Sequence, residues 1–127
     1  MSARILIIED TEDNRRILCD LLSSAGYEPH EAADGAEGLA AAQRLSPDLI
    51  LLDVQLPLID GYEVTRRLKA DPLLRTVPII AVTSYALSGD EAKARSAGCD
   101  AYVAKPFSPR RLLALVREIL EGGPGHG

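Results

Sequence analysis

Four short runs of apolar residues are spaced along the chain. They cover residues 5–8, 49–52, 77–82 and 101–104. Each run is as long as a strand and continuous rather than alternating, and most are rich in β-branched residues. Such runs are typical of strands that are buried on both faces, as in a parallel sheet.

Segments with helical periodicity lie between these runs. One face of the first segment is apolar and consists of Ile17, Leu18, Leu21, Leu22 and Ala25. Gly26 follows as a stop signal. Further amphipathic stretches cover roughly residues 36–45, 61–70, 87–97 and 109–121. The alternation of strand and helix predicts an open α/β sheet with right-handed crossovers.

A fifth, weaker strand is required between the first two helices, at residues 27–33. It is polar and contains Pro29, which cannot donate to a ladder, so this strand should lie at a sheet edge. The second strand is an edge in the flavodoxin-like order 2-1-3-4-5. We therefore predict a flavodoxin-like (βα)5 three-layer α/β fold, with five parallel strands in that order. The domain should cover residues 1–121, and the glycine-rich tail at 122–127 should be disordered.

Charged and polar residues directly follow the apolar runs. In chain order they are Glu9 and Asp10, then Asp53, then Thr83 and Ser84, and finally Lys105. In a parallel sheet these positions share the carboxyl edge, and ligands of open α/β folds bind there, where the strand order reverses. In the predicted order this point lies between the strands that deliver Asp10 and Asp53.

Three carboxylates placed that closely must share protons or hold a cation. Their oxygens are hard ligands and no His or Cys is near them, which favours Mg²⁺ over zinc or copper. Magnesium usually keeps several waters, which leaves room for a phosphoryl oxygen. Lys105 offers a positive charge and Thr83 a hydroxyl to a phosphate. A carboxylate can also attack phosphorus and form an aspartyl-phosphate.

The composition argues against several other classes of protein. A formal net charge of −5 does not suit non-specific nucleic-acid binding, which needs clustered Lys and Arg. No apolar run approaches the roughly 20 residues of a membrane span, and none resembles a signal-peptide core. We expect a cytoplasmic protein whose two cysteines, Cys19 and Cys99, are reduced. His30 and His126 should be exposed bystanders.

Several motifs in one order resemble the receiver domain of two-component response regulators, over about residues 4–120. They are Glu9-Asp10, the block 47–53, the loop from Leu56-Pro57 to Asp60-Gly61, Thr83-Ser84 and Ala104-Lys105-Pro106. The resemblance implies that Asp53 takes a phosphoryl group from a phosphohistidine on a histidine kinase or a phosphotransfer protein.

The resemblance also implies roles for the neighbouring residues. Asp10, Asp53 and the backbone carbonyl of Gln55 would bind Mg²⁺, and Glu9 would act through a coordinated water. Thr83, Ser84 and Lys105 would surround the phosphate, and Tyr102 would turn inward when Thr83 moves. Pro57 and Gly61 would shape the loop after Asp53, and the Lys105–Pro106 bond would be cis. These role assignments cover the residues Glu9, Asp10, Asp53, Gln55, Pro57, Gly61, Thr83, Ser84, Tyr102, Lys105 and Pro106.

The chain departs from the commonest receiver pattern at three places. Glu9 replaces the more frequent Asp and keeps its charge. Ser84 stands where a smaller alanine is usual, and Tyr85 comes next. Because both flank the expected phosphate entrance, they bear on the dephosphorylation rate and on partner access.

The expected output is a change in protein–protein binding on the fourth helix, fifth strand and fifth helix. We expect a single-domain regulator that is a monomer before phosphorylation and acts on a downstream protein partner. Two enzymatic or carrier alternatives fit less well. A haloacid-dehalogenase-like phosphohydrolase needs an acid two residues after its nucleophile, where Gln55 stands. A flavin carrier needs a hydroxyl- and glycine-rich loop where residues 9–13 are acidic. An interaction module that works without phosphorylation is a further alternative.

Overall fold

The computed structural model describes residues 3–83, 90–105 and 107–122, and for residues 90 and 91 it describes the backbone alone. In this part of the chain, strands and helices alternate. The strands are β1 (Arg4–Ile8), β2 (Glu28–Ala32), β3 (Leu49–Asp53), β4 (Ile79–Thr83) and β5 (Ala101–Ala104). The helices are α1 (Glu12–Ser24), α2 (Gly35–Leu45), α3 (Gly61–Ala70), α4 (Asp90–Ala97) and α5 (Pro109–Leu120).

The strands form one parallel sheet in the order β2-β1-β3-β4-β5, which confirms the predicted topology. Pro29 lies opposite Ile5 in β2, and β2 is an edge strand. Proline has no N–H to donate, and at an edge this position can lie on the side of the strand that has no partner. The order reverses between β1 and β3, so the carboxyl ends of these two neighbouring strands border the crevice where ligands of such sheets bind.

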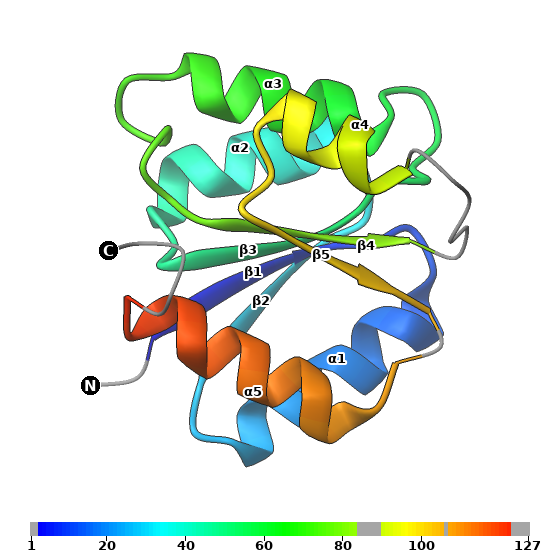
Figure 1. Cartoon of the computed structure of the whole chain (residues 1–127), viewed down its shortest axis with the longest axis vertical. Helices are drawn as coiled ribbons and strands as arrows, with labels where there is room; N and C mark the ends of the chain where they lie inside the picture. The colour runs from blue at the N-terminus through cyan, green and yellow to red at the C-terminus, as the bar shows by residue number, and fades with distance from the viewer. Residues whose placement is uncertain (1–2, 84–89, 106, 123–127) are drawn as a thin grey trace.

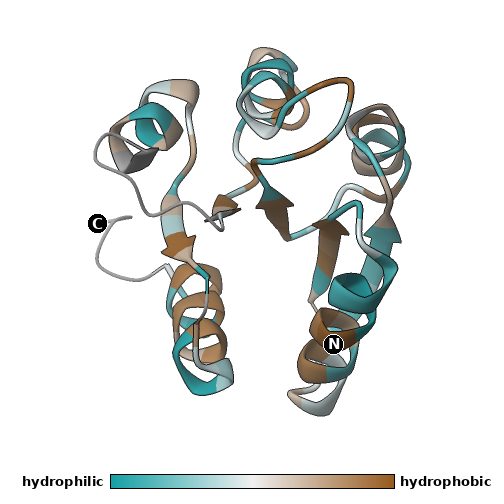
Figure 2. Cartoon of the chain, turned by 90° about the vertical axis from the view of Figure 1, so that its right-hand side faces the viewer, coloured by the Kyte–Doolittle hydropathy of each residue, from teal (hydrophilic) through white to brown (hydrophobic). Residues whose placement is uncertain are grey.

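The helices cover both faces of the sheet and make three layers (Figures 1 and 2). Helices α1 and α5 lie on one face, and α2, α3 and α4 lie on the other. Successive residues of β1 alternate between the two cores: Ile5 and Ile7 pack towards α1 and α5, and Leu6 and Ile8 towards α2 and α3. Because both faces are covered, the central strands need apolar residues at every position, which explains the continuous apolar runs.

Polar side chains cap the N-termini of the two helices that follow Asp53 and Lys105. The Asp60 carboxylate accepts a hydrogen bond from the Glu63 amide at 3.0 Å and begins α3 after the Asp53 loop. The Ser108 hydroxyl accepts one from the Arg111 amide at 3.0 Å and begins α5 after Lys105. These side chains satisfy amides that the first helical turn leaves without partners.

Some expectations need correction. Strand β4 begins at Ile79 rather than at residue 77, because the Val77 amide donates to the Leu74 carbonyl in a turn and Pro78 follows. Ile17 belongs to the apolar face by periodicity but is 64% exposed, since α1 packs on the sheet through Leu18 and Leu22. The predicted disordered tail lies, apart from residue 122, outside the described residues, as do residues 87–89 of the predicted fourth helix.

Both cysteines are free thiols, as expected. His30 is half-buried rather than exposed, and its Nε2 lies 2.7 Å from a Glu28 carboxylate oxygen on the same edge strand, whereas His126 lies outside the described residues. Among the described helices, none has the length and apolar character that crossing a membrane requires.

Candidate metal and phosphate site

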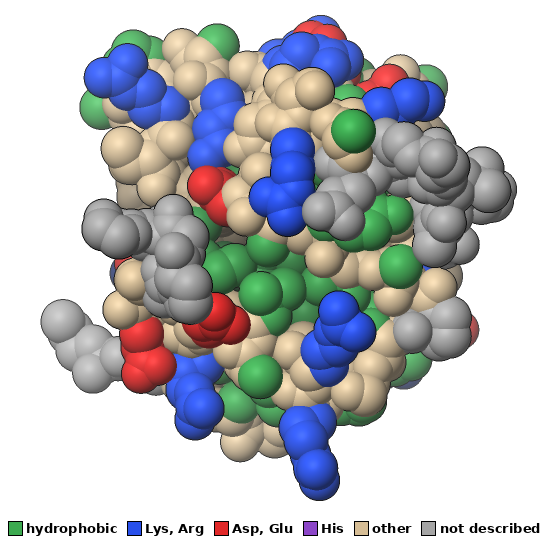
Figure 3. Space-filling view, viewed as in Figure 1, with side chains coloured by type: hydrophobic (Ala, Val, Ile, Leu, Met, Phe, Trp, Pro, Cys, Tyr) green, Lys and Arg blue, Asp and Glu red, His purple; other side chains and the backbone are tan. Residues whose placement is uncertain are grey.

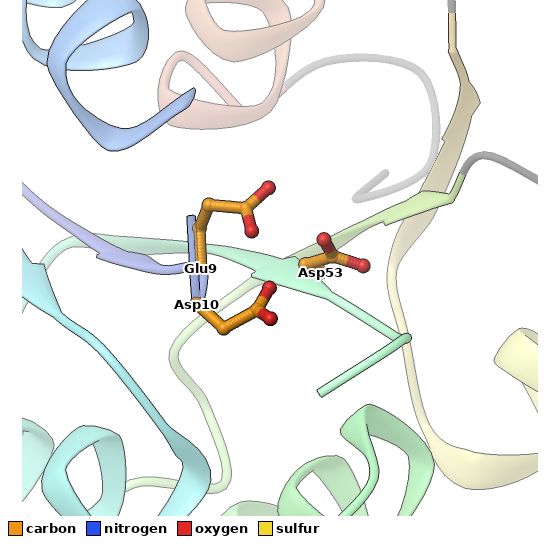
Figure 4. A group of neighbouring side chains, drawn as sticks. All are labelled: Glu9, Asp10 and Asp53. Carbon is orange, nitrogen blue, oxygen red and sulfur yellow. The ribbon is translucent and has the colours of Figure 1, made fainter. Parts of the chain in front are cut away.

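Three carboxylates meet at the carboxyl edge of the sheet. Glu9 and Asp10 follow β1, Asp53 ends β3, and one oxygen from each lies within 4.8 Å of the others. Figure 4 shows the three side chains directed towards a common space. Glu9 and Asp53 are 2% and 7% exposed, whereas Asp10 is open to solvent. The predicted meeting of Asp10 and Asp53 at the reversal of strand order is thus present in the structure.

Lys105 brings a positive charge to this cluster. Its Nζ lies 3.0 Å from Glu9 Oε1 and 3.5 Å from Asp53 Oδ2. The backbone of Lys105 extends the β4–β5 ladder, because its amide donates to the Thr83 carbonyl at 2.6 Å. The lysine therefore reaches the site from beyond the end of β5 and pairs most closely with Glu9, a partner that the sequence did not indicate.

Burial acts to raise the pKa of both buried carboxyl groups, and hydrogen bonds then separate the two values. Burial raises the pKa of Asp53, the Gln55 amide opposes this rise, and the neighbouring Glu9 adds to it, so that the pKa reaches about 6. Burial also acts to raise the pKa of Glu9. It is outweighed by hydrogen bonds, first from the Thr11 amide, and the pKa falls to about 2. The hydrogen bond with Glu9 raises the pKa of Asp10.

Lys105 shows the opposite balance. Burial alone would lower its pKa, but the hydrogen bond to Glu9 and the charge of Asp53 outweigh burial and raise it. With all four groups ionised, three carboxylates and one ammonium leave two negative charges in a partly buried space. An oxygen-only donor set with this excess charge fits a hard divalent cation such as Mg²⁺.

Backbone contacts position the acidic side chains. The Gln55 amide donates to Asp53 Oδ1 at 2.8 Å, and the Thr11 amide donates to Glu9 Oε2 at 3.1 Å. Arg15 Nη1 donates to the carbonyl oxygens of Glu9 and Asp10 at 2.9 and 3.2 Å. Arg15 was not among the predicted site residues, although helical side chains lean towards the helix N-terminus and so reach the preceding loop.

Gly61 is required where the loop after Asp53 closes. A Cβ at this position would lie 2.3 Å from Val54 Cα and 2.7 Å from the Asp53 carbonyl oxygen. The Gly61 amide donates to the Val54 carbonyl at 3.0 Å. Any side chain larger than hydrogen would push the start of α3 away from the end of β3.

The remaining predicted residues fall into two groups. Thr83 is buried at the end of β4, and Tyr102 is half-buried in β5 opposite Ala81. Ala81 and Thr83 are two residues apart, so Thr83 and Tyr102 belong to the same face of the sheet, towards α2, α3 and α4. Ser84 and Pro106, with the predicted cis bond, lie outside the described residues.

The comparisons with known proteins agree on one family. The response regulator receiver domain matches residues 5–117 of the chain. The polar-differentiation response regulator DivK of Brucella ovis is 43% identical over 120 residues, which cover 94% of this chain and 98% of DivK.

Solved structures give the same result. The receiver domain of the sensor histidine kinase PA1611 from Pseudomonas aeruginosa, with a magnesium ion coordinated in its active-site cleft, superposes with a TM-score of 0.88 at 37% identity. The superposition covers 95% of this chain and 99% of the PA1611 receiver domain. A CheY-like receiver domain protein from Methanospirillum hungatei gives 0.89 at 34% identity, with 95% of each chain covered. The chain thus belongs to the response regulator receiver domain family, whose members are phosphoacceptor signalling proteins rather than turnover enzymes.

Proposed function

We propose that Asp53 accepts a phosphoryl group from a phosphohistidine on a histidine kinase or a phosphotransfer protein, with Mg²⁺ in the acidic cluster. The observation that supports this most directly is the convergence of Asp53 with Glu9, Asp10 and Lys105 at the reversal of strand order. Asp10, Asp53 and the Gln55 carbonyl would hold the ion, and Glu9 would contact it through a water. When bound, Mg²⁺ supplies positive charge that stabilises the phosphoryl oxygens during transfer.

The protein side chains perform the rest of the reaction. An Asp53 carboxylate oxygen bonds to phosphorus while the P–N bond breaks, and the imidazole keeps the electron pair. The Gln55 amide holds Asp53 Oδ1, so Asp53 Oδ2, which faces Lys105, is the oxygen left for attack. The Lys105 ammonium stabilises negative charge on the incoming phosphoryl group. Above a pH of about 6, Asp53 is ionised and able to attack.

The loop after Asp53 limits what the site can do afterwards. Gln55 stands two residues beyond the nucleophile and has no carboxylate with which to act as a general acid or base. We therefore expect the aspartyl-phosphate to persist long enough to signal. Thr83 would move towards the phosphate and Tyr102, on the same face of the sheet, would follow it.

The surface around edge strand β5 is the proposed output. Figure 3 shows hydrophobic side chains gathered between α4 and α5, over β5. Strand β5 has one open edge and is only partly covered. A shift of Tyr102 would change this surface, and a downstream protein partner would bind one of the two states more tightly. We expect a cytoplasmic monomer before phosphorylation.

Intact-mass spectrometry tests the proposal. The protein is incubated with Mg²⁺ and acetyl phosphate, or with autophosphorylated histidine kinases, beside an Asp53→Asn control. The expected result is one added phosphoryl group on the native chain and none on the control. Absence of the added mass, or its appearance on Asp53→Asn, would contradict the proposal.

A further inference from the structure

Leu58 lies at the tip of the loop that connects β3 to α3, five positions after Asp53 in the chain. Its side chain is 99% exposed. Single exposed apolar residues are ordinary on protein surfaces and carry no argument by themselves. The backbone of Leu58, however, also adopts a conformation that is unusual for leucine.

The chain makes a tight γ-turn around Leu58. The Ile59 amide donates to the Pro57 carbonyl at 2.7 Å, and the φ of Leu58 is 67°. A γ-turn with positive φ at its centre is rare and strained, and a bulky residue there is a true outlier. Glycine or asparagine would relieve the strain. The exposed side chain gains no burial that would offset it.

The turn is held firmly on both sides. Pro57 has a restricted φ, and Ile59 packs against the core beneath α2 and α3. The Gly61 amide closes the loop onto the Val54 carbonyl at 3.0 Å. Leu58 is therefore presented in one position, and a partner that binds it has little loop entropy to remove.

We propose that Leu58 is a docking contact for the phosphohistidine-bearing protein that donates to Asp53, and that it enters an apolar pocket on that protein. This inference rests on the proposed function. A phosphohistidine ring can reach Asp53 only from the carboxyl edge of the sheet, and the β3–α3 loop forms part of that edge. A donor protein seated there meets Leu58, whereas a small phosphodonor does not.

Leu73 provides a matched control. It is also a leucine, is 87% exposed, and lies after the end of α3, between α3 and β4. Because α3 runs antiparallel to the strands, Leu73 lies at the amino edge of the sheet, away from Asp53. Loss of apolar surface in general would affect both leucines alike, but loss of a docking contact would affect Leu58 alone.

The experiment compares two donors of the same P–N bond on the full chain. One donor is monophosphoimidazole, and the other is the autophosphorylated histidine kinase that transfers fastest to the native protein in a screen of host kinases. Leu58→Ala should lower kcat/KM for the kinase by about tenfold or more, the loss expected from removing an interface anchor. Its rate with monophosphoimidazole should stay within about twofold, and Leu73→Ala should match the native protein with both donors.

Leu58→Gly separates the side chain from the strain. It should transfer as poorly from the kinase as Leu58→Ala, although its thermal midpoint should rise because the turn is relaxed. Native transfer from the kinase to Leu58→Ala would overturn the proposal, and so would an equal loss with both donors, which would indicate damage to the site. If the native chain takes no phosphate from either donor, the proposed function itself fails and the docking contact falls with it.

Discussion

Ionised Asp53 should destabilise the metal-free protein, and Asp53→Asn tests this. Asp53 is 7% exposed, and its pKa rises from 3.8 to about 6 in the folded state. A difference of about two pKa units corresponds to roughly 3 kcal/mol between the protonated and ionised forms. The asparagine amide removes the charge and keeps an oxygen that can accept the hydrogen bond from the Gln55 amide.

The sign of the effect follows from the direction of the shift. A carboxyl group whose pKa is raised by folding stabilises the protein below its unfolded pKa, and this stability is lost as the pH rises through the folded pKa. For Asp53 the window runs from pH 3.8 to about 6. At pH 8 without metal, Asp53→Asn should therefore be more stable than the native chain by up to about 3 kcal/mol. The advantage should shrink towards zero near pH 4.

Magnesium well above its dissociation constant should reverse the order of the two proteins. A ligand present at 1,000 times its dissociation constant stabilises the folded state by about 4.1 kcal/mol, which exceeds the advantage of about 3 kcal/mol. Asp53→Asn lacks the negatively charged oxygen that Asp53 would offer to the ion, so Mg²⁺ should stabilise this variant much less. Urea unfolding followed by far-UV circular dichroism suits a chain without tryptophan. It would be measured in EDTA and in Mg²⁺ at pH 4, 6 and 8, with the exposed Asp20→Asn as the charge control.

Three results would refute this explanation. If Asp53→Asn is less stable than the native chain in EDTA at pH 8, the buried carboxylate is not under electrostatic strain. If the difference is the same at pH 4 and pH 8, it does not come from the ionisation of Asp53. A gain of equal size in Asp20→Asn would point to the net charge of −5 rather than to the cluster.

Three further predictions concern the same site. The affinity for Mg²⁺, measured by calorimetry, should weaken about tenfold for each pH unit below about 6, because the ion competes with the proton on Asp53. An affinity unchanged between pH 7 and pH 5 would exclude Asp53 as a ligand. Arg15→Met should weaken Mg²⁺ binding by about tenfold or more, since it releases the carbonyls of Glu9 and Asp10. Arg15→Lys, which keeps a donor, should recover part of that loss. Gly61→Ala should lower the free energy of unfolding by about 1–3 kcal/mol through the contact of its Cβ with Val54, and an unchanged urea midpoint would contradict it.

The fold was largely predictable because its strongest signals are local. Continuous apolar runs mark strands buried on both faces, and Pro29 places the polar strand at an edge. The start of β4 was predicted two residues too early, because Val77 is apolar yet belongs to a turn that its hydrogen bond to Leu74 closes. Apolar character alone does not distinguish the end of a turn from the beginning of a strand.

The sequence predicted which strand ends meet at the site, but it did not predict which side chains pair there. The residues at the carboxyl ends of β1, β3 and β5 meet because the sheet is parallel, and this property can be read from the sequence. The 3.0 Å contact of Lys105 with Glu9 depends on how far a long side chain extends over the intervening strands. The contact of Arg15 with the acidic loop depends on side-chain direction on α1. Neither contact can be predicted from the spacing of residues along the chain.

The pairing of Lys105 with Glu9 bears on the order of events at the site. With the cluster ionised, the lysine offsets one of three negative charges, and the remaining two repel an anionic phosphodonor. A bound divalent cation would offset that excess and weaken the attraction of Lys105 to Glu9. The Lys105 ammonium would then be available to the phosphoryl group. We expect metal binding to precede productive contact with the donor, because the same excess negative charge would attract the ion and repel the phosphate.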